Sequence, residues 1–117
     1  MGSAGGPAIR FVRVLASSEV AEGEGRQLVL EGRSVAVFRH EGKVYAMDGI
    51  CPHAGSPLGP GFVSKGTVEC PWHGWRFRLA DGTSPDVEGL VQATYPAHEE
   101  DGSVFVGISG DDGVAER

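Results

Sequence analysis

Apolar and polar residues alternate along this 117-residue chain in short runs that glycine, proline and charged residues separate. Residues 9–15 (IRFVRVL) alternate between apolar and basic side chains, which is the two-residue period of a half-buried strand. No segment shows the sustained 3.6-residue period of a long helix. The pattern predicts strands at residues 9–15, 26–31, 34–39, 43–47, 68–69, 76–80, 89–96 and 103–108.

Glycine and proline mark the connections between these strands. The chain has 19 glycines, more than the usual share, and glycine readily adopts the positive φ of tight turns. Turns are predicted at His40-Glu41-Gly42 and Asp81-Gly82, and polar connections or loops at 17–25, 49–61 and 99–102. We therefore expect an all-β fold, a small antiparallel β-sandwich formed by residues 9–109, with flexible tails at 1–8 and 110–117.

Composition and charge exclude several functional classes. Ten basic and sixteen acidic residues give a net charge of −6, which argues against general nucleic-acid binding, because that needs positive charge to displace counterions. No run of 18 apolar residues exists, so no membrane span is expected. The N-terminal residues do not show the pattern of a secretory signal, so a cytoplasmic location is expected. The acidic surface could meet basic patches on partners, or it could simply be solvated.

Two short boxes carry the residues best suited to metal chemistry. The only two cysteines each precede a histidine: Cys51 and His53 lie in CPHAG, and Cys70 and His73 lie in CPWHG. Two thiolates and two imidazoles can hold a [2Fe–2S] centre, with both cysteines on one iron and both histidines on the other. The same donors could form a tetrahedral zinc site, although structural zinc usually has wider cysteine pairs. A disulfide is a third alternative, but it leaves the histidines unexplained and is rare in the cytoplasm.

The boxes at residues 51–61 (CPHAGSPLGPG) and 70–77 (CPWHGWRF) resemble the paired ligand boxes of Rieske proteins, C-x-H and C-x-x-H. The likeness is greatest to the Rieske-type ferredoxins of bacterial ring-hydroxylating dioxygenase systems, and small subunits of nitrite reductases share the fold. It is strong over residues 48–86 and weak over 9–108.

The resemblance implies one Rieske-type [2Fe–2S] cluster per chain, held in a two-loop cluster-binding lobe of about residues 48–86. By this likeness, Cys51 and Cys70 bind an inner, buried iron. His53 and His73 bind an outer iron near the surface.

Residues beside the ligands are expected to support such a cluster. Pro52 and Pro71 follow the cysteines directly and restrict the loop backbone. Gly55 and Gly74 could let backbone N–H groups approach the sulfurs, and such hydrogen bonds tune a cluster.

Two tryptophans and a proline complete the candidate site. Trp72 and Trp75 are large enough to exclude water, although ordinary core packing explains them equally well. Pro85 lies where related proteins have a third loop over the cluster, but an ordinary turn proline is a close alternative. High-potential Rieske proteins have hydroxyl donors at positions that match Trp75 and Phe77, so this chain should lie near the low end of the Rieske range, at roughly −150 mV.

The function that the resemblance implies is one-electron transfer from a flavin-dependent reductase to a terminal oxygenase, by a monomer or in transient complexes. The chain is expected not to be an enzyme on its own, since it is too short to hold the catalytic iron domain of an oxygenase as well. One alternative is the small subunit of an assimilatory nitrite reductase, and another is a zinc-stabilised binding module.

Acidic residues flank the presumed cluster end and could dock a partner or be solvated: Asp48, Glu69, Asp86 and Glu88. His40 and His98 are expected to be surface residues without a role.

Overall fold

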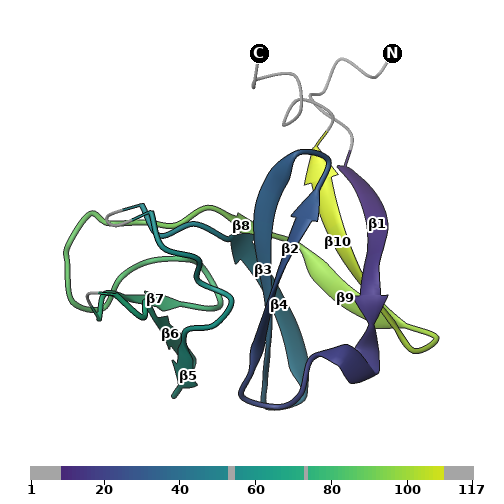
Figure 1. Ribbon diagram of the computed structural model, residues 1–117, viewed down its shortest axis with the longest axis horizontal. Coiled ribbons are helices and arrows are strands. Elements are labelled where there is room, and N and C mark those ends of the chain that lie inside the picture. The colour runs from purple at the N-terminus through teal and green to yellow at the C-terminus, as the bar shows by residue number, and fades with distance from the viewer. Residues whose placement is uncertain (1–8, 53–54, 73, 110–117) are drawn as a thin grey trace.

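The computed structural model describes residues 9–52, 55–72 and 74–109. It shows a β-sandwich with a smaller lobe beside it (Figure 1). In chain order the elements are β1 (Ile9–Ala16), the 3₁₀ helix η2 (Ser17–Glu19), β2 (Gly25–Leu30), β3 (Arg33–His40), β4 (Lys43–Asp48), β5 (Phe62–Ser64), β6 (Thr67–Glu69), β7 (Arg76–Arg78), β8 (Thr94–Tyr95), β9 (Ala97–Glu100) and β10 (Ser103–Ser109).

Three antiparallel sheets account for these strands. The sandwich is made of the sheets β1-β10-β9 and β2-β3-β4-β8, and the small lobe contains the sheet β5-β6-β7. All the pairings are antiparallel. The expected fold class, a small antiparallel β-sandwich with a smaller loop-rich lobe, is confirmed.

The central strands of the second sheet are buried on both faces. Successive side chains of a strand point to opposite faces, and in β3 this sends Val35 and Val37 into the core between the two sandwich sheets. Ala36 and Phe38 point the other way, into the core under the small lobe. A single sheet therefore closes the sandwich on one side and forms the floor of the small lobe on the other.

Most hairpins turn in the same way. Within the described residues, four hairpins have a two-residue loop in which both φ angles are positive: Glu31-Gly32, Glu41-Gly42, Lys65-Gly66 and Asp101-Gly102. Type I′ turns require such angles, and their twist matches that of the flanking strands. The turn predicted at His40-Glu41-Gly42 is one of them.

The strand predictions were wrong in three places. They missed β5 altogether, which lies between the predicted loop at 49–61 and the predicted strand at 68–69. Residues 89–96 do not form one strand, because only Thr94–Tyr95 pairs with β4, and Pro96, which has no N–H to donate, separates β8 from β9. Residues 99 and 100, predicted to lie in a polar connection, belong to β9. This short edge strand has only half-buried and exposed side chains, so its backbone pairing with β10 decides its conformation rather than an apolar pattern.

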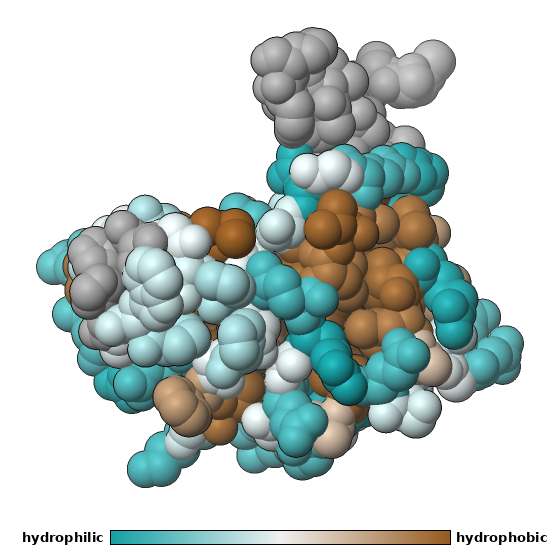
Figure 2. Space-filling model, viewed as in Figure 1, coloured by the Kyte–Doolittle hydropathy of each residue, from teal (hydrophilic) through white to brown (hydrophobic). Residues whose placement is uncertain are grey.

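The sandwich is open along the seam between its edge strands β1 and β2, where Figure 2 shows apolar side chains at the surface. Arg10 of β1 reaches across this seam to Glu31, and its two terminal nitrogens lie 3.0 and 2.9 Å from the carboxylate oxygens.

No helix in the described part of the chain is both long and apolar enough to cross a bilayer.

A half-buried ion pair joins the two sheets of the sandwich at their other side. Arg39 of β3 donates to both carboxylate oxygens of Glu99 in β9, at 3.0 and 2.6 Å. The same guanidinium donates to the carbonyl oxygens of Val20 and Ser17, which fixes the segment after β1. The hydrogen bond from Arg39 holds the pKa of Glu99 below its ordinary value.

The Glu99→Gln substitution should therefore lower the free energy of unfolding of the full chain at pH 7 by about 1–3 kcal/mol, because it removes a charged hydrogen bond. The lowered pKa of Glu99 gives stability that is complete above the ordinary carboxyl value of 4.5 and is lost as the pH falls through the folded value. Urea unfolding at pH 7 and near pH 3 would measure this effect, and the difference between wild type and variant should shrink at the lower pH. The control is Glu100→Gln, whose carboxylate is exposed. An equal loss in both variants would contradict the assignment.

Candidate metal centre

The two cysteines lie at the bottom of two loops of the small lobe. Cys51 and Cys70 are each 1% exposed, and no disulfide joins them. Both belong to the same apolar core, together with Ala36, Phe38, Met47, Leu58, Val68, Phe77 and Leu79. The disulfide alternative is therefore wrong for this structure, and the core keeps water from both sulfurs.

The first loop closes through two backbone hydrogen bonds at its cysteine. The N–H of Cys51 donates to the carbonyl of Ser56 at 2.8 Å, and the N–H of Gly55 donates to the carbonyl of Cys51 at 2.9 Å. An isolated antiparallel bridge between Ile50 and Pro57 lies just outside this ring. Four residues, 52–55, therefore form the tip of the loop.

The second loop has the same pair of backbone hydrogen bonds at its cysteine, and we call this pair the frame of each loop. The N–H of Cys70 donates to the carbonyl of Trp75 at 2.7 Å, and the N–H of Gly74 donates to the carbonyl of Cys70 at 3.0 Å. The flanking pair here is Glu69 and Arg76, at the top of the β6–β7 hairpin. The tip again has four residues, 71–74.

Both tips thus begin with a proline and end with a glycine at positive φ, 71° at Gly55 and 74° at Gly74. The N–H groups of these glycines bond to the cysteine carbonyls, and their positive φ closes the tips. The expected approach of backbone N–H groups to the sulfurs stays a prediction. His53 and His73 lie outside the described residues, but the sequence puts them at the second and third places of two tips with equal frames.

The chain passes from core to surface within one residue at each tip. Cys51 and Cys70 are buried, whereas Pro52 and Pro71, which follow them, are exposed. Ligands on the tips would therefore lie nearer to solvent than the sulfurs do.

The two tryptophans differ in their surroundings. Trp72 is 65% exposed, so the alternative of core packing is wrong for it: a tip residue has no core beside it. Trp75 is half-buried and packs against the core that holds both cysteines. For Trp75, core packing is confirmed. The water-excluding roles of both side chains stay a prediction.

The stems of the two loops differ, and here the sequence analysis missed two residues. The second tip stands on the paired strands β6 and β7, whereas the described residues of the first loop form one isolated bridge. Side chains of Gln27, from β2, and Gln92, which precedes β8, bond to the backbone on either side of Cys51. Neither residue belongs to a recognisable motif, and long-range folding brings both to the loop.

A third loop runs along the same end of the small lobe (Figure 1). It is closed by a bridge between Thr83 and Val91, and Pro85 lies exposed within it. Asp86 of this loop accepts two hydrogen bonds from Arg76, at 2.9 and 2.7 Å, and the Arg76 guanidinium holds the pKa of Asp86 below its ordinary value. This ion pair, called the latch below, thus fixes the third loop to the second box. That Pro85 covers a cluster stays a prediction.

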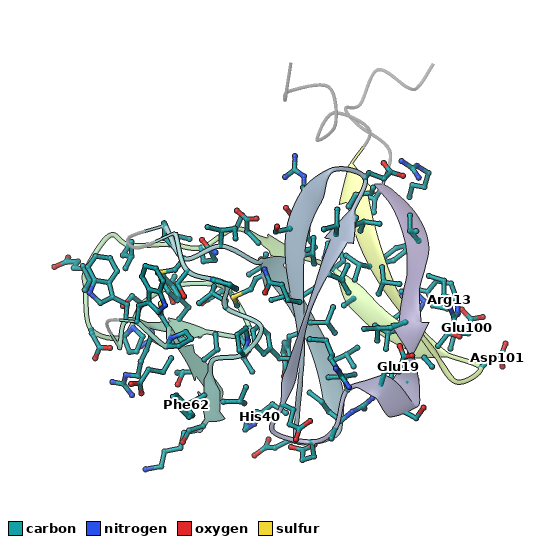
Figure 3. The ribbon with its side chains drawn as sticks, viewed as in Figure 1. Arg13, Glu19, His40, Phe62, Glu100 and Asp101 are labelled. Carbon is teal, nitrogen blue, oxygen red and sulfur yellow. The ribbon has the colours of Figure 1, made fainter. Side chains whose placement is uncertain are left out.

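Two of the acidic residues that flank the boxes, Asp48 and Asp86, have defined surroundings in the structure. Asp86 is paired with Arg76, and burial raises the pKa of Asp48 above its ordinary value. Other acidic side chains, among them Glu19, Glu100 and Asp101, lie at the side of the sandwich away from the small lobe (Figure 3). The acidic character of the chain is therefore not concentrated at the boxes.

The two remaining histidines lie in the sandwich. His40 is half-buried rather than a plain surface residue. The His98 ring stacks on Phe105, with ring centroids 5.3 Å apart, and meets the edge of Phe11 at 4.8 Å. Both come from the sandwich strands, not from the two boxes.

Comparison with known proteins agrees with this arrangement. Residues 10–96 match the family model of the Rieske [2Fe–2S] domain. The ferredoxin component of the naphthalene 1,2-dioxygenase system of Pseudomonas putida is 28% identical over 104 residues, which cover 86% of this chain and 98% of that protein.

Solved structures resemble the whole fold. One is assigned as the small subunit of an NADH-dependent nitrite reductase of Mycobacterium tuberculosis, with a TM-score of 0.81 and 26% identity over 86% of this chain and 96% of that one. Another is a complex of oxygenase and ferredoxin in carbazole 1,9a-dioxygenase, in which the matched chain has a TM-score of 0.74 and 26% identity over 82% of this chain and 91% of its own.

The chain therefore belongs to the Rieske [2Fe–2S] domain family. Its cofactor is a Rieske-type [2Fe–2S] cluster, and the described residues fit that group. Two thiols without a disulfide lie at matching points of two loops with equal frames, inside one apolar core. Thiolate is a soft ligand that suits iron in a sulfide core. The family match favours iron and sulfide over the zinc alternative.

Breaking the latch should loosen the third loop alone. In Asp86→Asn we expect amide exchange within residues 83–91 to become a few-fold faster, because the lost ion pair is partly exposed and contributes modestly. Hydrogen exchange measured by NMR would test this at low salt. At about 1 M salt the difference should fall, since the pair is screened. Glu88→Gln is the matched control in the same loop. The charge-swapped pair Arg76→Asp with Asp86→Arg should restore protection, and its failure to do so would contradict an electrostatic latch.

Proposed function

We propose that this chain is a one-electron carrier whose cluster is bound by Cys51, His53, Cys70 and His73. The observation that supports this most is the pair of four-residue tips with equal frames, each starting directly after a buried cysteine. The places of His53 and His73 in the proposal rest on their positions in these tips. The proposed unit is residues 9–109, with the cluster lobe at about 48–86.

The proposed ligands would hold the cluster from two sides, the apolar core and the surface. Cys51 and Cys70 would hold the cluster from the apolar core, where a thiolate is shielded from water. The tips would hold it from the solvent side, because the residues that follow both cysteines are exposed. When bound, the cluster supplies a centre that takes up and releases one electron. A redox partner that contacts the tips would come close to that centre without entering a pocket.

The relatives support a place between a reductase and an oxygenase. A ferredoxin component of a dioxygenase system matches almost from end to end, and a matched ferredoxin has been solved with its oxygenase. We propose that this chain receives electrons from a flavin-dependent reductase and passes them to a terminal oxygenase, as a cytoplasmic carrier in transient complexes. It would not catalyse a reaction by itself.

A second candidate is the small subunit of a nitrite reductase, which the higher TM-score to such a protein favours. Catalytic amounts of the pure chain that restore turnover of a reductase–oxygenase pair would support the first candidate. Stable co-purification with a large reductase subunit, without such turnover, would support the second.

Substitution of any of the four proposed ligands should remove the cluster signature. We expect Cys51→Ser, Cys70→Ser, His53→Ala and His73→Ala, prepared anaerobically with iron and sulfide, to lose the visible absorption and the paramagnetic signal of the reduced protein. The controls are His40→Ala and His98→Ala, which should keep both signals, because these residues lie outside the two boxes. A colourless wild-type protein that binds zinc would contradict the proposal.

The midpoint potential should lie near the low end of the Rieske range, at roughly −150 mV. Trp75 and Phe77 have no hydroxyl to donate to a sulfur, and Phe77 is fully buried in the core around the cysteines. Fewer donors stabilise the reduced cluster less. A redox titration followed by the visible spectrum would measure the potential, and a value well above zero would contradict the argument.

A further inference from the structure

Carboxamide side chains are scarce in this chain. It has two glutamines, Gln27 and Gln92, and no asparagine. Both glutamines bond to the backbone of the segment that carries the first box, although they are 65 residues apart in the sequence. This segment has the weaker stem of the two loops, with one isolated bridge between Ile50 and Pro57.

Gln27 spans the base of the first loop. Its amide nitrogen donates to the carbonyl of Gly49 at 2.9 Å, and its amide oxygen accepts from the N–H of Gly59 at 2.7 Å. A Cβ at Gly49 would lie 2.5 Å from that amide nitrogen, and a Cβ at Gly59 would lie 2.7 Å from the amide oxygen. Only glycine leaves room for the glutamine at these two places.

Gln92 holds the strand that leads into Cys51. Its side chain is part of a residue that is only 4% exposed, and its amide nitrogen donates to the carbonyls of Asp48 and Ile50 at 2.8 and 2.7 Å. Its own N–H donates to the carbonyl of Gly82 at 2.8 Å. A Cβ at Gly82 would collide with the carbonyl oxygen of Gln92, so the backbone there is built closely around this residue.

A carboxamide suits both places for one chemical reason. It is uncharged at any pH, and it offers two N–H donors and a carbonyl acceptor. A lysine or arginine could donate to the carbonyls but would add a positive charge near the metal centre, and a glutamate would repel them. The two glutamines therefore replace the missing strand pairs of the first stem without changing the local charge.

We propose that Gln27 and Gln92 are positioning residues that set the first box, and with it Cys51, relative to the second box. The proposal rests on the function proposed above, because it assumes that the cluster bridges the two boxes. The second box needs no such side chains, since the β6–β7 hairpin carries it. The geometry at the iron atoms should then depend on the two glutamines more than on equally buried residues of the sandwich.

The test compares cluster-loaded full-length variants. Gln92→Met and Gln27→Met keep the approximate side-chain volume and remove the hydrogen bonds. We expect cluster release to a chelator to become about tenfold faster, because the buried carbonyls lose their partners, and the g-values of the reduced cluster to shift. Tyr95→Phe is the matched control. Tyr95 lies three residues after Gln92, and its hydroxyl accepts a hydrogen bond from Arg33, which this substitution removes. Leu30→Ala controls for plain destabilisation, since Leu30 lies in the sandwich core.

The outcomes separate a positioning role from a structural one. Shifted g-values and faster release in the two glutamine variants, with unshifted g-values in Tyr95→Phe and Leu30→Ala, would support the proposal. Wild-type g-values and release rates in both methionine variants would overturn it. If Gln92→Met does not fold, Gln27→Met decides alone: it removes the hydrogen bonds to Gly49 and Gly59, so its g-values should shift, and wild-type g-values and release rates in it would overturn the proposal. A wild-type chain that binds no cluster would instead defeat the proposed function itself.

Discussion

One sheet with two buried faces supports the whole molecule. Alternate residues of β3 face opposite ways, so Val35 and Val37 help to fill the sandwich while Ala36 and Phe38 lie under the cysteines. Burial of apolar side chains is the main stabilising term in folding, and here the same strand contributes it to both cores. In the part of the small lobe that the structure describes there are three short strands, so this shared sheet provides the floor that its loops need.

The two loop tips of the candidate site have the same backbone hydrogen bonds, but different elements hold them in place. Each tip is closed by the same two hydrogen bonds between a buried cysteine and the residues four and five places later. The first stands on a single bridge with two glutamine side chains, and the second stands on a hairpin that an ion pair latches to the third loop. A cluster that spans the two boxes would thus be fixed both by the sandwich and by the small lobe.

Much of the fold could be predicted because the local pattern and the final structure agree. The strands β1 to β4, β6, β7 and β10 follow predicted segments to within one or two residues. The disagreements have a common cause. β5 and β9 are edge strands with few buried side chains, and the segment before β8 is organised by a bridge between Thr83 and Val91. Pairing between distant backbone segments decides these parts, and no local period records it.

The sequence by itself determined the class of chemistry, because the order and spacing of two cysteines and two histidines suit few metal centres, and turn residues surround them. Only the tertiary structure decided that both thiols share one core, that Trp72 is exposed, and that Gln27 and Gln92 meet the same loop. The physical reason is the range of the interactions: a ligand box and a tight turn are local properties of the chain, whereas burial and side-chain bracing depend on segments that folding alone brings together.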